Sequence, residues 1–232
     1  MKRPSSNAAA GVHEKVANIC KDMPSGKVLD APAGQGALSM RLVEIGHKIS
    51  AFDIDETSFR AENKGIEFTK GNLNLDLPYQ DSSFDCVVCV EGLEHLENIY
   101  HILRQFARIL RPGGKLIITT PNIVSLASRI KFMLFGSFRY YNSKVDIADR
   151  SLASHISPLG FSQLEYALER SGFTIEKVMT NTDMNLWRVP RSVVAALYRW
   201  VNLRFNKAYN PVLCSPDILF GEIVIIEARR SQ

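Results

Sequence analysis

The sequence contains few cysteines and no long uninterrupted apolar run. The four cysteines, Cys20, Cys86, Cys89 and Cys214, are unevenly spaced among 232 residues and predict neither a disulfide framework nor a zinc module. The longest apolar runs are interrupted by charged residues well short of the roughly 20 residues that cross a bilayer. No basic segment followed by an apolar stretch and a cleavage site begins the chain. These absences predict a cytoplasmic protein without a membrane-spanning helix.

The spacing of Cys86 and Cys89 matches a C-x-x-C motif, but its setting argues against metal or disulfide chemistry. Both residues lie within the apolar run Phe84–Val90, which is typical of a buried strand. Residues three apart on a strand point to opposite faces, so the two thiols do not converge on one ion or form one bond. We therefore expect both side chains in the core.

There is also little excess of charge of either sign. The net charge is +4, and it is unevenly distributed. Residues 1–120 hold 14 basic and 15 acidic residues, whereas residues 121–232 hold 14 basic and 9 acidic residues. An excess this small does not by itself indicate a nucleic-acid partner. We expect the positive charge to lie in the second half of the protein and nucleic acid not to be its partner.

Short apolar runs alternate with helical patterns, which is typical of a parallel sheet covered by helices on both faces. The runs predicted as strands are 27–30, 48–53, 66–70, 84–90, 115–120, 173–179 and 221–228. The helical patterns cover 37–45, 55–61, 93–110, 123–135, 162–171 and 191–205. The predicted fold class is therefore α/β, with a mostly parallel seven-stranded sheet. We expect one domain over residues 11–232, a disordered segment at 1–10, a lid inserted after the fifth strand, and cap segments at about 123–160 and 186–216.

A glycine-bearing turn joins the first strand to the first of these helices. The run Lys27–Asp30 continues into Ala31–Gly36, and such a turn lets a ligand approach the backbone at a helix N-terminus. The second strand ends at Asp53, whose carboxylate can accept hydrogen bonds from two ribose hydroxyls. A dinucleotide site would need a third glycine at the helix start, where Ser39 stands. These residues favour a nucleoside-containing cofactor over a dinucleotide, and a tight turn without a ligand is the alternative.

Four ordered motifs resemble those of the class I S-adenosylmethionine-dependent methyltransferases, a family with a Rossmann-like fold. Val28–Gly36 resembles their first motif, and Asp53 matches their ribose-binding acid. Gly71–Leu73 with the following Leu77–Asp85 resembles the segment over the adenine, and Leu110–Leu116 resembles the turn before their fifth strand. Within this family the pattern is most similar to the ubiquinone-biosynthesis O-methyltransferases.

The resemblance implies that S-adenosylmethionine is the cofactor and that the protein is an enzyme. Carried over position by position, the residues expected to bind the cofactor are Asp30, Ala31, Gly34, Gly36, Asp53, Ile54, Asn72, Leu73 and Glu91. Two positions depart from the family pattern. Pro32 replaces the usual first glycine, and Asn72 replaces the usual aspartate, although an amide oxygen can still accept a hydrogen bond from the adenine amino group.

His95 and His155 are the candidate catalytic residues, because transfer to a hydroxyl requires a base near the reacting oxygen. Glu91, Glu94 and His95 form an E-x-x-E-H pattern that resembles the metal-binding pattern of the ubiquinone-type enzymes and of the small-RNA 3′-end methyltransferases. In the latter a later histidine completes the site, and His155 has a comparable place in the order. The predicted metal ligands are therefore Glu91, Glu94, His95 and His155, holding magnesium or another divalent ion. A metal-free helix start, with the glutamate capping backbone amides, is the alternative.

Basic and aromatic segments in the second half are the candidates for acceptor binding. Ile130–Tyr141 follows the fifth strand and is expected to form the lid, and Trp187–Phe205 is expected to join it as a cap. We expect the apolar side of the cap to pack on the core. If that side is exposed, it suits a lipid-linked acceptor or contact with a membrane surface.

The predicted reaction is methyl transfer to an oxygen of a small-molecule, glycan or lipid-linked acceptor. Three alternatives are kept: methylation of RNA, S-adenosylmethionine binding by a regulatory protein without turnover, and a nicotinamide-dependent oxidoreductase, which Ser39 disfavours. The sequence does not predict the oligomeric state.

Overall fold

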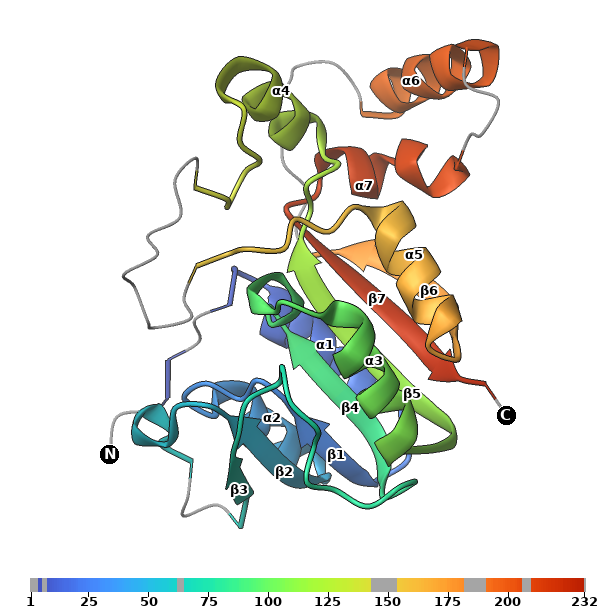
Figure 1. Cartoon of the computed structure of the whole chain (residues 1–232). Helices are drawn as coiled ribbons and strands as arrows, with labels where there is room; N and C mark the ends of the chain where they lie inside the picture. Colours follow the sequence, from blue (N-terminus) through green and yellow to red (C-terminus); the bar gives the residue numbers. More distant parts are fainter. Residues whose placement is uncertain are drawn as a thin grey trace.

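The fold is a seven-stranded sheet with helices on both faces (Figure 1). The computed structural model describes residues 4–5, 8–61, 65–142, 154–181, 191–205 and 210–231. The strands are β1 (Lys27–Asp30), β2 (Lys48–Asp53), β3 (Glu67–Lys70), β4 (Phe84–Val90), β5 (Leu110–Pro121), β6 (Phe173–Thr180) and β7 (Ile223–Arg230). They are ordered β3-β2-β1-β4-β5-β7-β6, with β7 antiparallel to both of its neighbours and β1 to β5 parallel. This confirms the predicted mostly parallel seven-stranded sheet.

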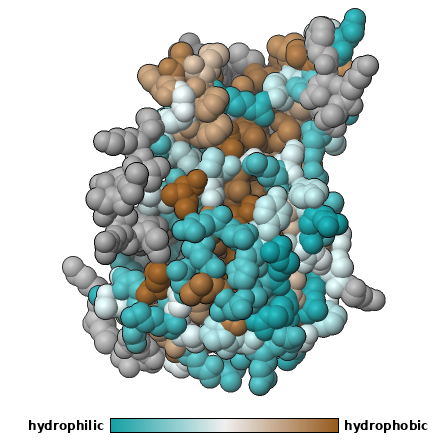
Figure 2. Space-filling view, viewed as in Figure 1, coloured by the Kyte–Doolittle hydropathy of each residue, from teal (hydrophilic) through white to brown (hydrophobic). Residues whose placement is uncertain are grey.

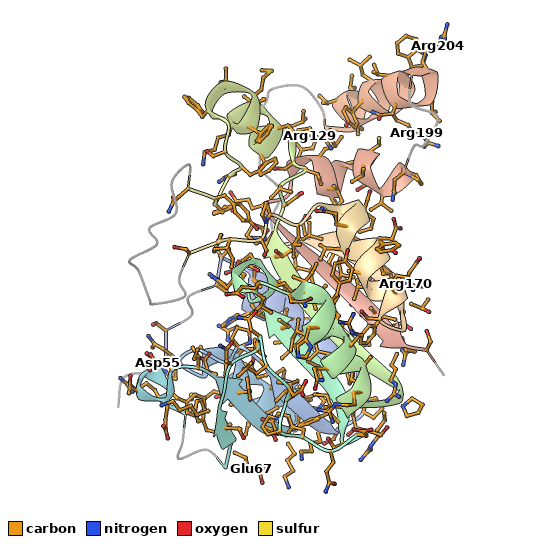
Figure 3. The ribbon with its side chains drawn as sticks, viewed as in Figure 1. Asp55, Glu67, Arg129, Arg170, Arg199 and Arg204 are labelled. Carbon is orange, nitrogen blue, oxygen red and sulfur yellow. The ribbon has the colours of Figure 1, made fainter. Side chains whose placement is uncertain are left out.

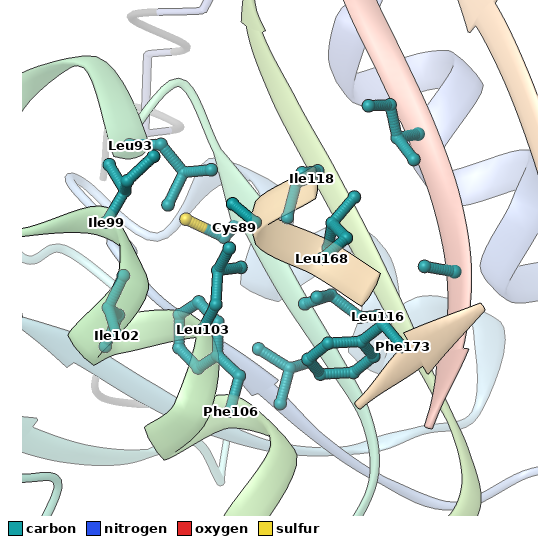
Figure 4. Packing of buried hydrophobic residues seen from close by; sticks show 14 of the residues in the cluster. Cys89, Leu93, Ile99, Ile102, Leu103, Phe106, Leu116, Ile118, Leu168 and Phe173 are labelled. Carbon is teal, nitrogen blue, oxygen red and sulfur yellow. The ribbon is translucent and has the colours of Figure 1, made fainter. Parts of the chain in front are cut away.

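Four helices cover the two faces of the sheet. They are α1 (Val12–Lys21) and α2 (Ala37–Ile45) on one face and α3 (Ile99–Ile109) and α5 (Phe161–Arg170) on the other. The two cysteines of β4 confirm this division, because Cys86 packs with the first pair of helices and Cys89 with the second. Figure 4 shows Cys89 among the side chains of α3 and α5. All four cysteines are buried and free, as expected for core residues.

Three more helices lie beyond the edge of the sheet where β5 ends and β7 begins (Figure 1). They are α4 (Leu126–Phe135), α6 (Arg191–Phe205) and α7 (Pro216–Phe220). A small apolar cluster of Ala195, Leu219 and Phe220 joins α6 to α7. The helices α4 and α6 fall within the predicted lid and cap segments, whereas α7 begins where the second segment ends. Of these segments, residues 143–153, 186–190 and 206–209 lie outside the described residues. No described helix is both long enough and apolar enough to cross a membrane.

The prediction of a helix at 55–61 is wrong. Only one short 3-10 turn, η1 (Glu56–Ser58), forms in this segment. The Asp55 carboxylate accepts hydrogen bonds from the amide of Thr57 at 2.9 Å and from its hydroxyl at 2.6 Å. These side-chain bonds offer the backbone an alternative to helical hydrogen bonds.

The helix predicted at 93–110 is divided. A 3-10 turn, η3 (Leu93–His95), is followed by extended backbone at Leu96, and α3 begins only at Ile99. Asn98 caps the second piece by accepting a hydrogen bond from the His101 amide at 3.0 Å. The helical spacing of the apolar residues continues across this break and gives no sign of it. The signal for two separate pieces was Asn98, a residue type that favours helix N-caps.

Two helices were not predicted at all, α1 and α7. The signal for α1 was present, because its buried residues Val12, Val16, Ala17 and Cys20 have helical spacing. For α7 the signal was weaker, since Ser215 caps only a five-residue helix with a proline in its first turn. The first of these omissions matters for function, because α1 lies beside the site described next.

Candidate active site

A pocket of about 460 Å³ lies at the carboxyl-terminal edge of the parallel strands. The loops that follow β1, β2 and β4 form its walls, as expected for ligand sites in open α/β sheets. Asp30 and Asp53 line this pocket, and so do His95 and His155. The structure therefore brings most of the predicted cofactor residues and both predicted catalytic histidines to one cavity.

The glycine-bearing loop after β1 is held against the tip of β2. The Gly34 amide donates a hydrogen bond to Asp53 Oδ2 at 2.7 Å. Gly36 is the N-cap residue before α2 and has a φ of +84°. A Cβ at this position would lie 2.7 Å from the Cβ of Ala61 and 2.8 Å from the Phe59 ring. The second glycine is therefore required by both its backbone conformation and its packing.

Asp53 is buried, and two backbone amides fix its carboxylate. Gly34 contacts one oxygen, and the Asp55 amide donates to Oδ1 at 3.0 Å. Because each carboxylate oxygen has two lone pairs, both oxygens can still accept a hydrogen bond from a ligand. The carboxylate is thus held in one orientation at the pocket wall.

Asp30 is bonded to Ser39, the residue that replaces the third glycine of a dinucleotide motif. Ser39 Oγ donates to Asp30 Oδ2 at 2.5 Å, and both side chains are buried. Burial raises the pKa of Asp30 to about 7; the Ser39 hydrogen bond opposes this shift, and the charge of Asp53 adds to it. Ser39 therefore positions the carboxyl group of Asp30, a role that the sequence did not reveal.

Most residues predicted to bind the cofactor line the pocket. They are Asp30, Gly34, Asp53, Ile54, Asn72, Leu73 and Glu91. The other two do not line it. Ala31 is buried, and its amide donates to the Val88 carbonyl oxygen at 3.0 Å, whereas Gly36 is the N-cap residue of α2. Asn72 Oδ1 accepts a hydrogen bond from the Asn74 amide at 2.9 Å, which fixes the side-chain amide at the pocket edge.

The N-terminal segment contributes pocket residues that the sequence interpretation missed. The pocket is also lined by Ser5, Ala8 and His13. Ser5 Oγ donates to Gln35 Oε1 at 3.0 Å, and the Ala9 amide contacts the Glu91 carboxylate at 3.3 Å. Burial lowers the pKa of His13 to about 4, so this side chain is neutral.

The disorder expected at 1–10 and the domain boundaries stay predictions. Among the first ten residues that the structure describes, Ser5 and Ala8 line the pocket.

Glu91 occupies a sharp turn directly after β4 and does not begin a helix. Its φ of +47° lies in the left-handed region, which non-glycine residues rarely adopt. Its amide donates to Thr119 Oγ1 at 2.9 Å, which holds the turn against β5. The carboxylate lies at the pocket wall, and burial raises its pKa.

Glu94, His95 and His155 form a cluster in which one potential ligand atom of each lies within 4.8 Å of the others. His95 Nδ1 lies 3.1 Å from the Ser154 carbonyl oxygen. A carbonyl only accepts, so this contact requires a proton on Nδ1, and in the uncharged tautomer with that proton Nε2 is an acceptor. Glu94 is fully buried, and neither of its carboxylate oxygens has a hydrogen-bond partner within the described part of the chain. Glu91, the fourth predicted ligand, lies outside this cluster.

The loop that carries His155 is fixed to η3 by backbone hydrogen bonds. The amides of Ile156 and Ser157 both donate to the Glu94 carbonyl oxygen at 2.9 Å. The Tyr141 hydroxyl donates to the Ser157 carbonyl oxygen at 2.8 Å, and its ring lies 5.3 Å from that of His155. Burial lowers the pKa of His155, and the neighbouring His95 lowers it further, which favours the neutral imidazole.

The buried Glu94 predicts an unusual pH dependence of stability. Burial raises the pKa of Glu94 from its ordinary 4.5 to about 8, so the folded protein holds a proton there that the unfolded chain releases above about pH 4.5. The stabilisation of the folded state by this bound proton is therefore complete at low pH and is lost as the pH rises toward 8. The raised pKa of Asp30 also makes the free energy of unfolding fall as the pH rises, over a range that ends near pH 7.

We expect the free energy of unfolding of the Glu94→Gln variant to fall less steeply between pH 5.5 and 8 than that of the wild type. The slopes should differ by about 1.4 kcal/mol per pH unit, the value for one proton. Urea unfolding in the presence of EDTA measures both slopes without competition from metal ions. The exposed Glu97→Gln variant is the control and should keep the wild-type slope. Equal slopes for Glu94→Gln and the wild type would show that Glu94 is ionised in the folded protein.

Residues 29–118 match the family model described as a methyltransferase domain. The strand order and the pocket at the ends of β1 and β2 agree with this match. This match, and the similarity of the same part of the chain to S-adenosylmethionine-dependent methyltransferases, confirm the resemblance inferred from the motifs.

Particular relatives extend the comparison. A ubiquinone biosynthesis O-methyltransferase from Xanthomonas oryzae pv. oryzae is 33% identical over 111 residues, covering 44% of this chain and 45% of the relative. The 27-O-demethylrifamycin SV methyltransferase of Amycolatopsis mediterranei is 29% identical over 121 residues, covering 48% of this chain and 44% of the relative. This chain thus spans a little under half the length of these curated relatives.

The fold extends beyond the matched segment. The solved structure of an S-adenosylmethionine-dependent methyltransferase from Mesorhizobium loti superposes with a TM-score of 0.58, covering 95% of this chain and 99% of that one at 18% identity. At this low identity the similarity concerns the fold alone.

Proposed function

We propose that the protein transfers the methyl group of S-adenosylmethionine to an oxygen atom of a small-molecule, glycan or lipid-linked acceptor. The observation that carries this proposal is that one pocket is lined by both a fixed Asp53 carboxylate and the two histidines. One cavity therefore holds groups suited to a nucleoside and groups suited to removing a proton.

The cofactor half of the proposal rests on the walls of the pocket near β1 and β2. Asp53 would accept hydrogen bonds from the two ribose hydroxyls, since its carboxylate is already oriented by backbone amides. Ile54 and Leu73 supply apolar surface for the adenine. The Gly34 turn lets the rest of the cofactor approach the backbone.

The catalytic half of the proposal rests on His95. In the reaction the carbon–sulfur bond of the sulfonium breaks as the acceptor oxygen forms a bond to the methyl carbon, and the hydroxyl proton must leave. In the uncharged tautomer whose Nδ1 donates to the Ser154 carbonyl, His95 Nε2 carries no proton and can accept the hydroxyl proton. The neutral His155 lies beside it, with ring centroids 4.7 Å apart, and would contact the acceptor.

The same cluster is also suited to bind a divalent ion, which would give a second, metal-assisted form of the mechanism. Glu94, His95 and His155 offer two imidazoles and a carboxylate, a donor set that divalent ions accept. The buried carboxylate of Glu94, which lacks a hydrogen-bond partner among the described residues, agrees with such a role. When bound, the ion would lower the pKa of the acceptor hydroxyl. His95 would then be a ligand and not the base.

Oxygen as the acceptor atom is supported by the names of two relatives, a ubiquinone biosynthesis O-methyltransferase and a 27-O-demethylrifamycin SV methyltransferase. Those names describe the relatives, and their matched segments cover half of this chain or less. The acceptor class proposed here therefore rests on them together with the histidine cluster.

Calorimetry with S-adenosylmethionine and with NAD tests the cofactor, and transfer of a labelled methyl group tests the reaction. We expect micromolar binding of S-adenosylmethionine and no comparable binding of NAD. Labelled product should then form with a catechol, an oligosaccharide or a polyprenyl-linked sugar, and not with RNA. Preference for NAD would refute the cofactor, and transfer to RNA alone would refute the acceptor class.

A further inference from the structure

The helices α4 and α6 carry an exposed apolar surface at one end of the molecule. We define this cap surface by its exposed apolar side chains, which are Ile130, Phe132, Met133, Leu134, Phe135, Val193, Leu197, Trp200, Val201 and Leu203. Met133 is 76% exposed, Phe135 70% and Trp200 61%. Figure 2 shows the brown, hydrophobic atoms gathered at the end of the molecule that bears these helices. Apolar patches of this kind mark interaction sites.

The exposed apolar residues of α6 are distinct from those that anchor the helix. The inner side packs through Ala195, Val194 and Tyr198 on the small cluster shared with α7. Val193 and Leu197 lie on the outer side, followed by Trp200 and Val201. Because these four positions are separated by four, three and one residues, they form one stripe along the helix. The expectation that the apolar side of this segment packs on the core is therefore correct only for its inner side.

The charge of these two helices has one sign. Their 25 residues include the basic residues Arg129, Lys131, Arg191, Arg199 and Arg204 and no acidic residue. Arg129 stacks over the Tyr198 ring with its guanidinium carbon 4.9 Å from the ring centroid, which ties α4 to α6. Figure 3 labels Arg199 and Arg204 on α6, the helix that also bears the outer stripe. An apolar stripe whose helices carry only positive charge is complementary to a layered surface, one with an anionic outer layer over an apolar interior.

We propose that the cap surface binds the surface of an anionic lipid bilayer. Basic amphipathic helices with tryptophan and phenylalanine on the apolar side lie in the plane of the membrane interface, with the apolar side buried among the acyl chains and the basic residues near the headgroups. The protein would attach peripherally, since no described helix is both long and apolar enough to span the bilayer.

This attachment would bring the pocket close to lipid-linked acceptors. A four-residue turn, 122–125, joins β5 to α4, and β5 holds the turn at Glu91 through Thr119. The cap surface and the pocket therefore lie at the same edge of the sheet. The link to a lipid-linked acceptor rests on the proposed function, whereas bilayer binding does not.

Flotation with lipid vesicles tests the apolar part of the cap surface. Vesicles of phosphatidylcholine with about 30% phosphatidylglycerol should bind the full chain in the absence of cofactor, and pure phosphatidylcholine should bind it more weakly. The Trp200→Glu variant should lose at least about tenfold in affinity. Tyr166→Glu on α5 is the matched control, because Tyr166 is 57% exposed and lies outside the cap surface. It should bind like the wild type.

A second pair of variants tests the charge. Arg199→Gln with Arg204→Gln should weaken binding by about 25-fold, since each basic residue near an anionic surface contributes about fivefold. The control replaces two exposed arginines elsewhere, Arg104 on α3 and Arg170 on α5, and should have little effect. Raising the salt concentration should weaken wild-type binding.

Three results would overturn the proposal. They are no wild-type binding to anionic vesicles at low salt, equal loss in Trp200→Glu and Tyr166→Glu, and a wild-type dimer that only Trp200→Glu dissociates while vesicle binding is absent. The last result would assign the surface to a second copy of the chain. Calorimetry with S-adenosylmethionine on the same samples keeps this test separate from that of the proposed function.

Discussion

The Asp53→Ala variant is expected to bind S-adenosylmethionine at least about 100-fold more weakly than the wild type. In the proposed complex the Asp53 carboxylate accepts two ribose hydrogen bonds, and bonds to a charged group contribute about 1.5–3 kcal/mol each. The substitution also removes the acceptor for the Gly34 and Asp55 amides, so the loop after β1 loses its attachment to β2. Both consequences weaken the cofactor half of the pocket, and calorimetry measures their sum.

The Asp53→Asn variant separates these two consequences. Its amide oxygen can still accept one backbone hydrogen bond, whereas the charge is lost, so we expect binding between those of the wild type and the alanine variant. The exposed Asp76→Ala variant is the control for removal of an acidic residue and should bind normally. Wild-type affinity in Asp53→Ala, with an unchanged unfolding temperature, would remove Asp53 from the cofactor site.

The His95→Gln variant is expected to lose about 10²–10⁴-fold in kcat, the usual contribution of a general base. Its affinity for S-adenosylmethionine should stay within about twofold of the wild type, because the proposed ribose contacts lie at Asp53. Glutamine is close to histidine in size and can keep a hydrogen bond to the Ser154 carbonyl oxygen, but it cannot take up the proton. Labelled methyl transfer under saturating cofactor measures kcat, and calorimetry measures the binding.

His101→Gln is the matched control, because His101 lies on α3 and does not line the pocket. Chelation distinguishes the two versions of the chemistry. If His95 is the base, EDTA should leave the wild-type rate unchanged; if it is a metal ligand, EDTA should abolish the rate and magnesium should restore it. An unchanged kcat in His95→Gln under both conditions would exclude both roles.

The strands and the cofactor loop were predictable because their signals are local. Apolar runs of four to eight residues bounded by turns defined β1, β2 and β4 with their observed limits. The helix ends were less predictable, because the same apolar spacing continues across the break before Asn98. There the competing signal is a single side chain that caps the backbone of α3.

The sequence by itself determined the resemblance to a methyltransferase domain, the parallel sheet and the position of Asp53 at the end of β2, since short-range spacing of apolar, glycine and acidic residues specifies each of them. Only the tertiary structure decided that Glu91 lies apart from the cluster, that Ser39 holds Asp30, and that His155 lies against His95 across 60 residues of chain. It also decided that the outer stripe of α6 is exposed. These features depend on contacts between segments far apart in the chain, and the periodicity within one segment shows that a helix has an apolar side but not what covers that side.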